Sequence, residues 1–149
     1  MKGVKAYILA NLETYLAAVE SARSVTIPRW DYLDVGYDKA PHKTSIEILP
    51  IRGTREYGNR EGGPLLESFS DHDIAVIIKN IGGDPNETMW AVLRYDEAIQ
   101  DMILADDTCG SRFVWALLEE VETGDMMQAS EAGRFRFAIA RTIKVREFE

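Results

Sequence analysis

The last segment of the chain, GRFRFAIARTIKVREFE (residues 133–149), constrains the fold more than any other. Aromatic and aliphatic residues alternate there with arginine and lysine, and no turn signal follows Gly133. This alternation is typical of a β-strand with one buried face. A strand over residues 134–146 exceeds the common length of about five or six residues. It therefore needs a long partner strand, either in the same chain or in another subunit.

The rest of the chain supplies two helical patterns and three further strand patterns. The helices are expected over residues 3–22 and 85–105, and the strands over 44–51, 72–80 and 112–122. The order is α-β-β-(β)-α-β-β, where the bracketed strand is optional. It predicts an α+β fold with a mostly antiparallel sheet of four to five strands and two main helices packed against it. The 149 residues are expected to form a single domain.

The second helix has clear end signals. Asp84 is expected to cap it, Pro85 suits the first helical position, and Glu87 completes a capping box. Asp106, Asp107 and Gly110 mark its exit. Its expected apolar stripe consists of Trp90, Leu93, Ile99, Met102 and Ile103.

Two connections look irregular. Residues 52–64, RGTREYGNREGGP, are rich in glycine and arginine and are expected to form a mobile loop. Residues 123–133 contain methionine, glutamine and serine and are expected to form an arm-like connection.

Charge is distributed unevenly along an acidic chain of formal net charge −8. Residues 84–131 carry twelve acidic and two basic side chains, whereas residues 132–146 carry five basic side chains and none that is acidic. An antiparallel hairpin of strands 112–122 and 134–146 would bring the two regions together. In one register Glu122 faces Arg134 and Glu120 faces Arg136, and such cross-strand pairs stabilise a sheet. The apolar layer of that register is Val121, Leu117 and Phe113 against Phe135, Ile139 and Ile143.

Nothing acidic faces Arg141, Lys144 or Arg146 in this register. We therefore expect these three side chains to contact the acidic region of a neighbouring copy. Contacts between different surfaces of identical subunits close into a ring when the rotation allows it. The charge pattern thus predicts a homo-oligomeric ring.

No pattern in the sequence indicates catalysis, a cofactor or a metal ion. Asp71, His72 and Asp73 are adjacent, but on a strand the two carboxylates point away from the histidine. Cys109 is the single cysteine and lies in an acidic turn that disfavours a reactive thiolate. No segment is long and apolar enough to predict a membrane span.

Arg52, Arg55 and Arg60 in the expected loop fit contact with a phosphate backbone, or simple solvation beside Glu56 and Glu61. The acidic balance of the chain argues against a dedicated nucleic-acid-binding protein.

The order of elements resembles the tail terminator, or tail-completion, family of long-tailed bacteriophages, and the related minor tail and head–tail joining proteins. The segments that carry the resemblance are the N-terminal helix, TSIEILPIRGTREYGNREGGP, HDIAVIIKN, TMWAVLRYDEAIQDMILA and the closing RFAIARTIKV. The resemblance covers nearly the whole chain in element order and rests on no signature motif.

This resemblance implies a non-enzymatic structural protein of the virion tail, made in the host cytoplasm. It implies a hexameric ring that caps the tail tube, ends tail polymerisation and offers a surface for head–tail joining. The implied partners are the chain itself, the tail tube protein and the head connector protein, while DNA passes through without specific binding. The alternatives are a small nucleic-acid-associated or ligand-binding protein, or another head–tail adaptor component.

Overall fold

The computed structural model describes residues 2–30, 44–58, 67–111, 113–123, 127–128 and 133–148. Its elements run in the order α1 (Lys2–Arg23), β1 (Ser45–Gly58), β2 (Glu67–Gly82), α2 (Pro85–Ala105), β3 (Trp115–Thr123), β4 (Met127–Gln128) and β5 (Phe135–Phe148). The expected α+β class, the antiparallel sheet and both helices are confirmed.

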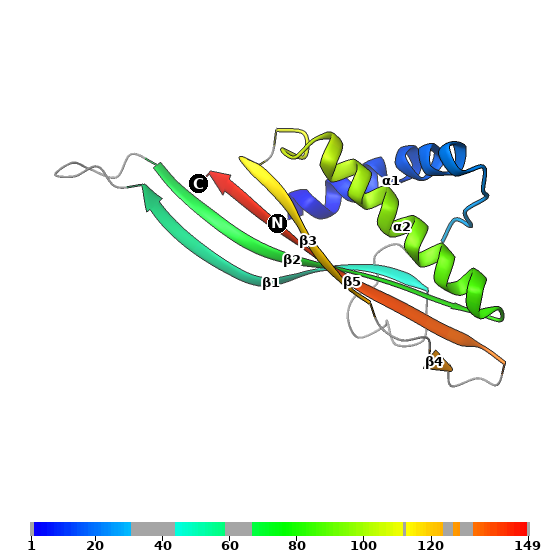
Figure 1. Cartoon of the computed structure of the whole chain (residues 1–149). Helices are drawn as coiled ribbons and strands as arrows, with labels where there is room; N and C mark the ends of the chain where they lie inside the picture. The colour runs from blue at the N-terminus through cyan, green and yellow to red at the C-terminus, as the bar shows by residue number, and fades with distance from the viewer. Residues whose placement is uncertain are drawn as a thin grey trace.

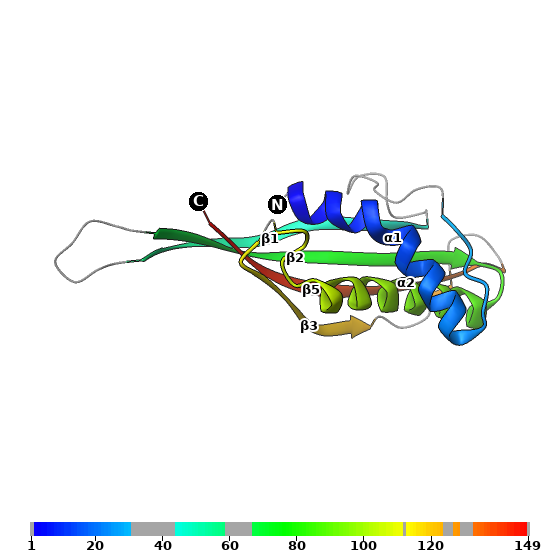
Figure 2. The same cartoon turned by 90° about the horizontal axis from the view of Figure 1, so that it is seen from above.

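The sheet has the strand order β1-β2-β5-β3, and the short β4 pairs with β5. The long partner of the closing strand is β2, which pairs with β5 without a register shift from Phe69 opposite Phe148 to Gly82 opposite Phe135. Both helices lie on the same side of this long, twisted sheet (Figures 1 and 2). The closing strand is therefore a central strand within its own subunit.

The core lies between the helices and one face of the sheet. The helix α1 buries Val4, Ile8, Leu12, Leu16 and Val19, as its apolar spacing predicts. The sheet contributes alternate residues of its central strands, which are Ile74, Val76 and Ile78 from β2 and Ile139, Ile143 and Val145 from β5. Alternation thus places one face of the sheet in the core and leaves the other face away from the helices.

The ends of α2 follow the expected signals. The Asp84 side chain accepts hydrogen bonds from the backbone N–H groups of Asn86 (2.8 Å) and Glu87 (3.2 Å), and Pro85 is the first helical residue. At the exit the Asp106 carboxylate accepts from the Thr108 N–H (3.0 Å) and the Gly110 N–H (2.8 Å). The Asp84 cap satisfies backbone N–H groups that have no partner within the helix, whereas the Asp106 carboxylate holds the turn that follows it.

The expected apolar stripe of α2 is wrong at one position. Ile99, Met102 and Ile103 are buried and Leu93 is partly buried, but Trp90 is 49% exposed. At about 100° per residue, Trp90 lies on the opposite side of the helix from Ile99. The buried positions near it are instead taken by Thr88, Val92 and Tyr95.

The expected mobile loop at 52–64 is wrong for residues 52–58, which continue strand β1. They pair with residues 67–73 of β2 after a bulge between Pro50 and Arg52. Glycine suits position 53 in this strand, because the Cβ of any other residue would lie only 3.0 Å from Nδ1 of His72 and crowd it. We call residues 52–58 and 67–73 the ribbon; it projects well past the helices (Figures 1 and 2). Residues 59–64 lie outside the described residues.

The expected hairpin register between the last long strands is also wrong. Leu118 faces Ile143, five positions from the expected Ala138, and a bulge shifts the pairing once more between Leu118 and Val121. A shift of an odd number of residues exchanges the two faces of a strand. Leu117, expected in the core, is therefore 56% exposed, while Ala116 is buried.

The expected arm at 123–133 is interrupted by regular structure. Thr123 still belongs to β3, and the two residues of β4 pair with β5, with Met127 opposite Arg136. Residues 124–126 and 129–132 lie outside the described residues.

Candidate functional site

The basic side chains of β5 are paired within the subunit. We expected Arg141, Lys144 and Arg146 to face no acidic residue of their own chain, and this expectation is wrong. Their partners are Asp96 of α2, Glu119 of β3 and Asp71 of β2, respectively. Asp96 and Asp71 lie in elements that the hairpin hypothesis did not place beside β5, whereas Glu119 lies in the expected partner strand but in a different register.

Arg141 is buried between β5 and α2. Its side chain is 8% exposed, and its Nε and Nη2 donate to the two carboxylate oxygens of Asp96 at 2.5 and 2.8 Å. Its Nη1 donates to the backbone oxygen of Glu119 at 2.9 Å. This fork-shaped pairing fixes the position of α2 on the sheet and leaves Arg141 inaccessible to another subunit.

Arg146 forms a similar pair nearer the ribbon, in a more exposed place. Its Nε and Nη2 each donate to an Asp71 oxygen at 2.7 Å, and its guanidinium lies 5.5 Å from the centroid of the Trp115 ring. The hydrogen bonds from Arg146 hold the pKa of Asp71 below its usual value. Lys144 lies 3.2 Å from Glu119, and both side chains are more than a third exposed.

The remaining predicted contact residues do not form the expected pairs. Glu122 lies opposite Ala140, and Glu120 falls in the bulge of β3. Arg136 lies opposite Ile81 of β2 and Met127 of β4, and Arg134 is exposed just before β5. The structure therefore does not bring Glu120 and Glu122 together with Arg134 and Arg136 in the predicted register.

The three arginines of the expected loop are now partly placed. Arg52 and Arg55 belong to β1, opposite Asp73 and Ser70 of β2, while Arg60 lies outside the described residues. In this pairing Arg52 is next to an acidic position.

Asp71, His72 and Asp73 all lie on β2 within the ribbon, although the expected strand began only at His72. His72 Nε2 lies 2.8 Å from Glu147 Oε1, whereas Asp71 binds Arg146. In the described part of the chain no cluster of three or more histidine, cysteine or acidic residues has the arrangement of a metal site. Cys109 is buried in the turn after α2.

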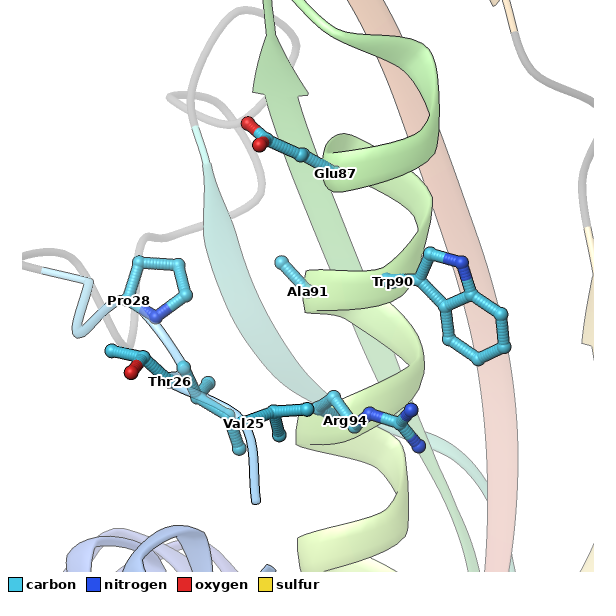
Figure 3. Close-up of a pocket in the computed structure, with 8 residues that line it drawn as sticks. Val25, Thr26, Pro28, Glu87, Trp90, Ala91 and Arg94 are labelled. Atoms are coloured by element: carbon cyan, nitrogen blue, oxygen red, sulfur yellow. The ribbon is translucent and has the colours of Figure 1, made fainter. Parts of the chain in front are cut away.

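A hollow of about 500 Å³ lies between α2 and the segment that leaves α1. Val25, Thr26, Ile27 and Pro28 line one side, and Glu87, Trp90, Ala91 and Arg94 line the other (Figure 3). Trp90 is half exposed and its ring lies 4.8 Å below the Arg94 guanidinium. Sequence reasoning missed this site because it assigned Trp90 to the buried stripe of α2, although Trp90 lies about 180° around the helix from Ile99.

The segment at residues 25–30 is fixed to both helices. The Tyr95 hydroxyl donates to the Pro28 backbone oxygen at 2.9 Å and accepts from the Trp30 backbone N–H at 3.1 Å. The rings of Tyr95 and Trp30 stack with centroids 3.8 Å apart. Arg29 binds Glu13 at 2.7 Å and also Glu20 of α1. Burial raises the pKa of Tyr95. The segment at residues 25–30, which forms one wall of the hollow, is therefore held in place by contacts with both helices.

This chain matches no protein-family model and no curated protein sequence. Among the described residues, neither helix has the length and apolar character needed to cross a membrane.

Proposed function

We propose that this chain is a structural virion protein that forms a ring on the end of a bacteriophage tail tube, ends tail polymerisation and offers a surface for head–tail joining. The proposal starts from the resemblance in element order to tail terminator and tail-completion proteins. That order is helix, two strands, helix and two closing strands, and the structure has this order with the two-residue strand β4 added between the closing strands.

The observation that carries the proposal is the ribbon. Its two strands extend beyond the helices, so neither α1 nor α2 covers it (Figures 1 and 2). Residues 144–148 of β5 pair with residues 69–73 along one edge of the ribbon, and the β1 edge and the tip remain for a neighbouring subunit to bury. Repeated contacts between the ribbon of one subunit and the body of the next are heterologous and can close a ring.

The two edges of the sheet offer the second supporting feature. Along the described strand order, β1 and β3 are the edge strands, and each has an irregular register at one point. Edge strands present backbone groups that can pair with another chain, and bulges restrict where such pairing occurs. The regular part of the β1 edge in the ribbon is a natural place for a neighbour.

The charge pattern supports the ring in a different way from the one first expected. The pairs of Arg141, Lys144 and Arg146 lie within the subunit, so attraction between the acidic middle and the basic end of two copies no longer supports ring closure. The net charge of −8 remains. In the proposed hexameric ring, an acidic wall repels phosphates and lets DNA pass without specific binding.

The proposed partners are further copies of the chain, the tail tube protein and the head connector protein. The proposed location is the virion tail after synthesis in the host cytoplasm. The proposal assigns the chain no enzymatic activity and no cofactor.

Tail tube assembly in the presence of the purified chain tests this proposal. The tube protein of the same phage is polymerised with and without the full-length chain, and tube lengths and ends are measured by electron microscopy. The proposal predicts shorter tubes that end in a six-fold cap. Tubes of unchanged length with bare ends would refute it.

A further inference from the structure

We propose that the hollow between α2 and residues 25–28 binds an extended peptide of a partner protein. The peptide carries a basic residue at the Glu87 end of the hollow and an acidic residue, three positions away, at the Arg94 end. Apolar residues lie between the two charges. This contact is separate from the proposed ring and does not depend on it.

The hollow has an apolar middle and a charged residue toward each end. Figure 3 shows Ala91 between Trp90 on one side and Pro28 on the other. Glu87 lies toward one end of this arrangement and Arg94 toward the other (Figure 3). The volume of about 500 Å³ lies within the range of roughly 300–1,000 Å³ that is typical of ligand sites. Such sites combine apolar walls with a few polar groups, as this hollow does.

The apolar part of the hollow is exposed in the free subunit. Among the described residues four large apolar side chains are exposed, and two of them, Val25 (38%) and Trp90 (49%), line this hollow. Covering them with an apolar side chain removes apolar surface from water, which favours binding. Tryptophan is also frequent in the energetic centres of protein interfaces.

The charged residues are spaced for an extended peptide. Glu87 and Arg94 are seven residues apart on α2, so they lie on nearly the same face and about 10 Å apart along the axis. Trp90 projects to one side of the line that joins them, and Ala91 to the other. Three residues of extended chain also span about 10 Å. A peptide that lies along this line therefore brings residues three positions apart to Glu87 and Arg94.

Both charged groups can bind a further partner. Glu87 is exposed, and its carboxylate has no hydrogen-bond or ion-pair partner among the described residues. Arg94 donates from Nη1 to Glu97 at 3.2 Å, while its Nε and Nη2 have no acceptor in the described part of the chain. Glu97 also accepts from Arg23 at 2.8 Å. Arg94 can therefore donate to a second carboxylate, and hydrogen bonds between charged groups are stronger than those between neutral ones.

The backbone of residues 25–27 offers a further contact. The N–H groups of Val25 and Ile27 both bind Glu20, one to its backbone oxygen at 3.2 Å and the other to its carboxylate at 2.8 Å. Alternate N–H groups of an extended segment share one side, so the N–H and C=O groups of Thr26 point away from Glu20. Neither group has a partner among the described residues. An extended peptide in the hollow can pair with them as an added strand does.

NMR titration of the full-length protein with the blocked peptide acetyl-Lys-Ala-Leu-Glu-amide tests the binding. We expect saturable shift changes in residues 25–28 and 87–94, including the indole N–H of Trp90, with a Kd of roughly 1 mM or lower. No saturable change in these residues up to about 10 mM peptide would overturn the proposal.

Glutamine substitutions on both sides test the placement of the charges. Replacing the lysine or the glutamate of the peptide by glutamine is expected to weaken binding about three- to fivefold. In Glu87→Gln the lysine of the peptide should no longer matter, and in Arg94→Gln its glutamate should no longer matter. Losses of the same size in the native protein and in both variants would overturn this placement.

Ala91→Leu tests the location, with Ala105→Leu as its matched control. Ala91 lies in the middle of the hollow, so a leucine there occupies the space for the peptide, whereas Ala105 is exposed at the end of α2. We expect Ala91→Leu to raise the Kd about tenfold or more and Ala105→Leu to change it less than about twofold. Equal Kd values in the two variants would overturn the location. If the NMR spectrum shows that Ala91→Leu is unfolded, Glu87→Gln and Arg94→Gln, which add no bulk, decide the question.

Discussion

Two arginines of the same strand, Arg141 and Arg146, make similar forked pairs in different surroundings. Arg141 binds Asp96 beneath α2 with both side chains less than a tenth exposed, whereas Arg146 binds Asp71 at the start of the ribbon with both about a quarter exposed. The first pair fixes a helix to the sheet, and the second joins two strands where no helix covers them. The comparison shows that β5 uses one arginine to hold α2 on the sheet and another to join β2 in the ribbon, beyond the helices.

Removing Arg141 should have the largest effect on stability. Arg141→Ala leaves the Asp96 carboxylate buried without its cation, which is expected to cost about 3–5 kcal/mol of unfolding free energy. Urea denaturation followed by circular dichroism measures this loss. The double variant Arg141→Met with Asp96→Leu is the control, since replacing the whole pair by apolar groups should restore most of the stability. A loss below about 1 kcal/mol in Arg141→Ala would contradict a buried pair.

Removing the Tyr95 hydroxyl should have the next largest effect. Tyr95→Phe keeps the ring stacked on Trp30 but leaves the Pro28 carbonyl and the Trp30 N–H without this partner. The expected cost is about 1–2 kcal/mol. Thermal unfolding measures it, with Tyr15→Phe on α1 as the control that should change stability little. Equal effects would mean that Tyr95 does not hold the segment at residues 25–30.

Removing Arg146 should have a smaller effect that depends on pH. Arg146→Met is expected to cost about 1 kcal/mol at pH 7. Because Arg146 lowers the pKa of Asp71, the pair stabilises the fold above the unfolded pKa of about 3.9, and this stabilisation is lost as the pH falls through the folded pKa. The difference in unfolding free energy between native protein and variant should therefore shrink as the pH falls below about 4. A difference that stays constant with pH would exclude the Asp71 pair as its source.

Lys144 should matter least of the three basic residues. Its partner Glu119 is also exposed, and pairs of this kind contribute about 0.2–1 kcal/mol at most. Lys144→Ala should shift the urea midpoint only slightly, and 1 M salt should remove the shift because exposed pairs are screened. A loss as large as that of Arg146→Met would break the proposed order of the three sites.

Sequence patterns predicted those parts of the fold whose signals are local. The boundaries of α2 follow from Asp84 and Pro85 at one end and Asp106 at the other, because caps act within a few residues. The strand at 134–146 follows from alternation alone. Both kinds of signal need no knowledge of the rest of the chain.

The partners of these elements could not be predicted in the same way. Pairing Glu120 with Arg136 was reasonable for an isolated hairpin, but β2 also pairs with β5 and determines which face of β5 meets the helices. Arg141 then turns toward Asp96, a residue in α2 that hairpin reasoning did not consider. Glycine and arginine at residues 52–58 indicated a loop, whereas pairing with β2 over a long register outweighs those weak local preferences.

Amide hydrogen exchange on the free protein and on tail tubes capped by it tests the central claim most directly. The claim is that the ribbon contacts neighbouring subunits in the assembly, whereas the basic side chains of β5 contact residues of their own subunit. We predict that exchange slows on capping in the ribbon peptides, residues 52–58 and 67–73, and stays unchanged in residues 134–144. Slower exchange in residues 134–144 with an unchanged ribbon would contradict the account.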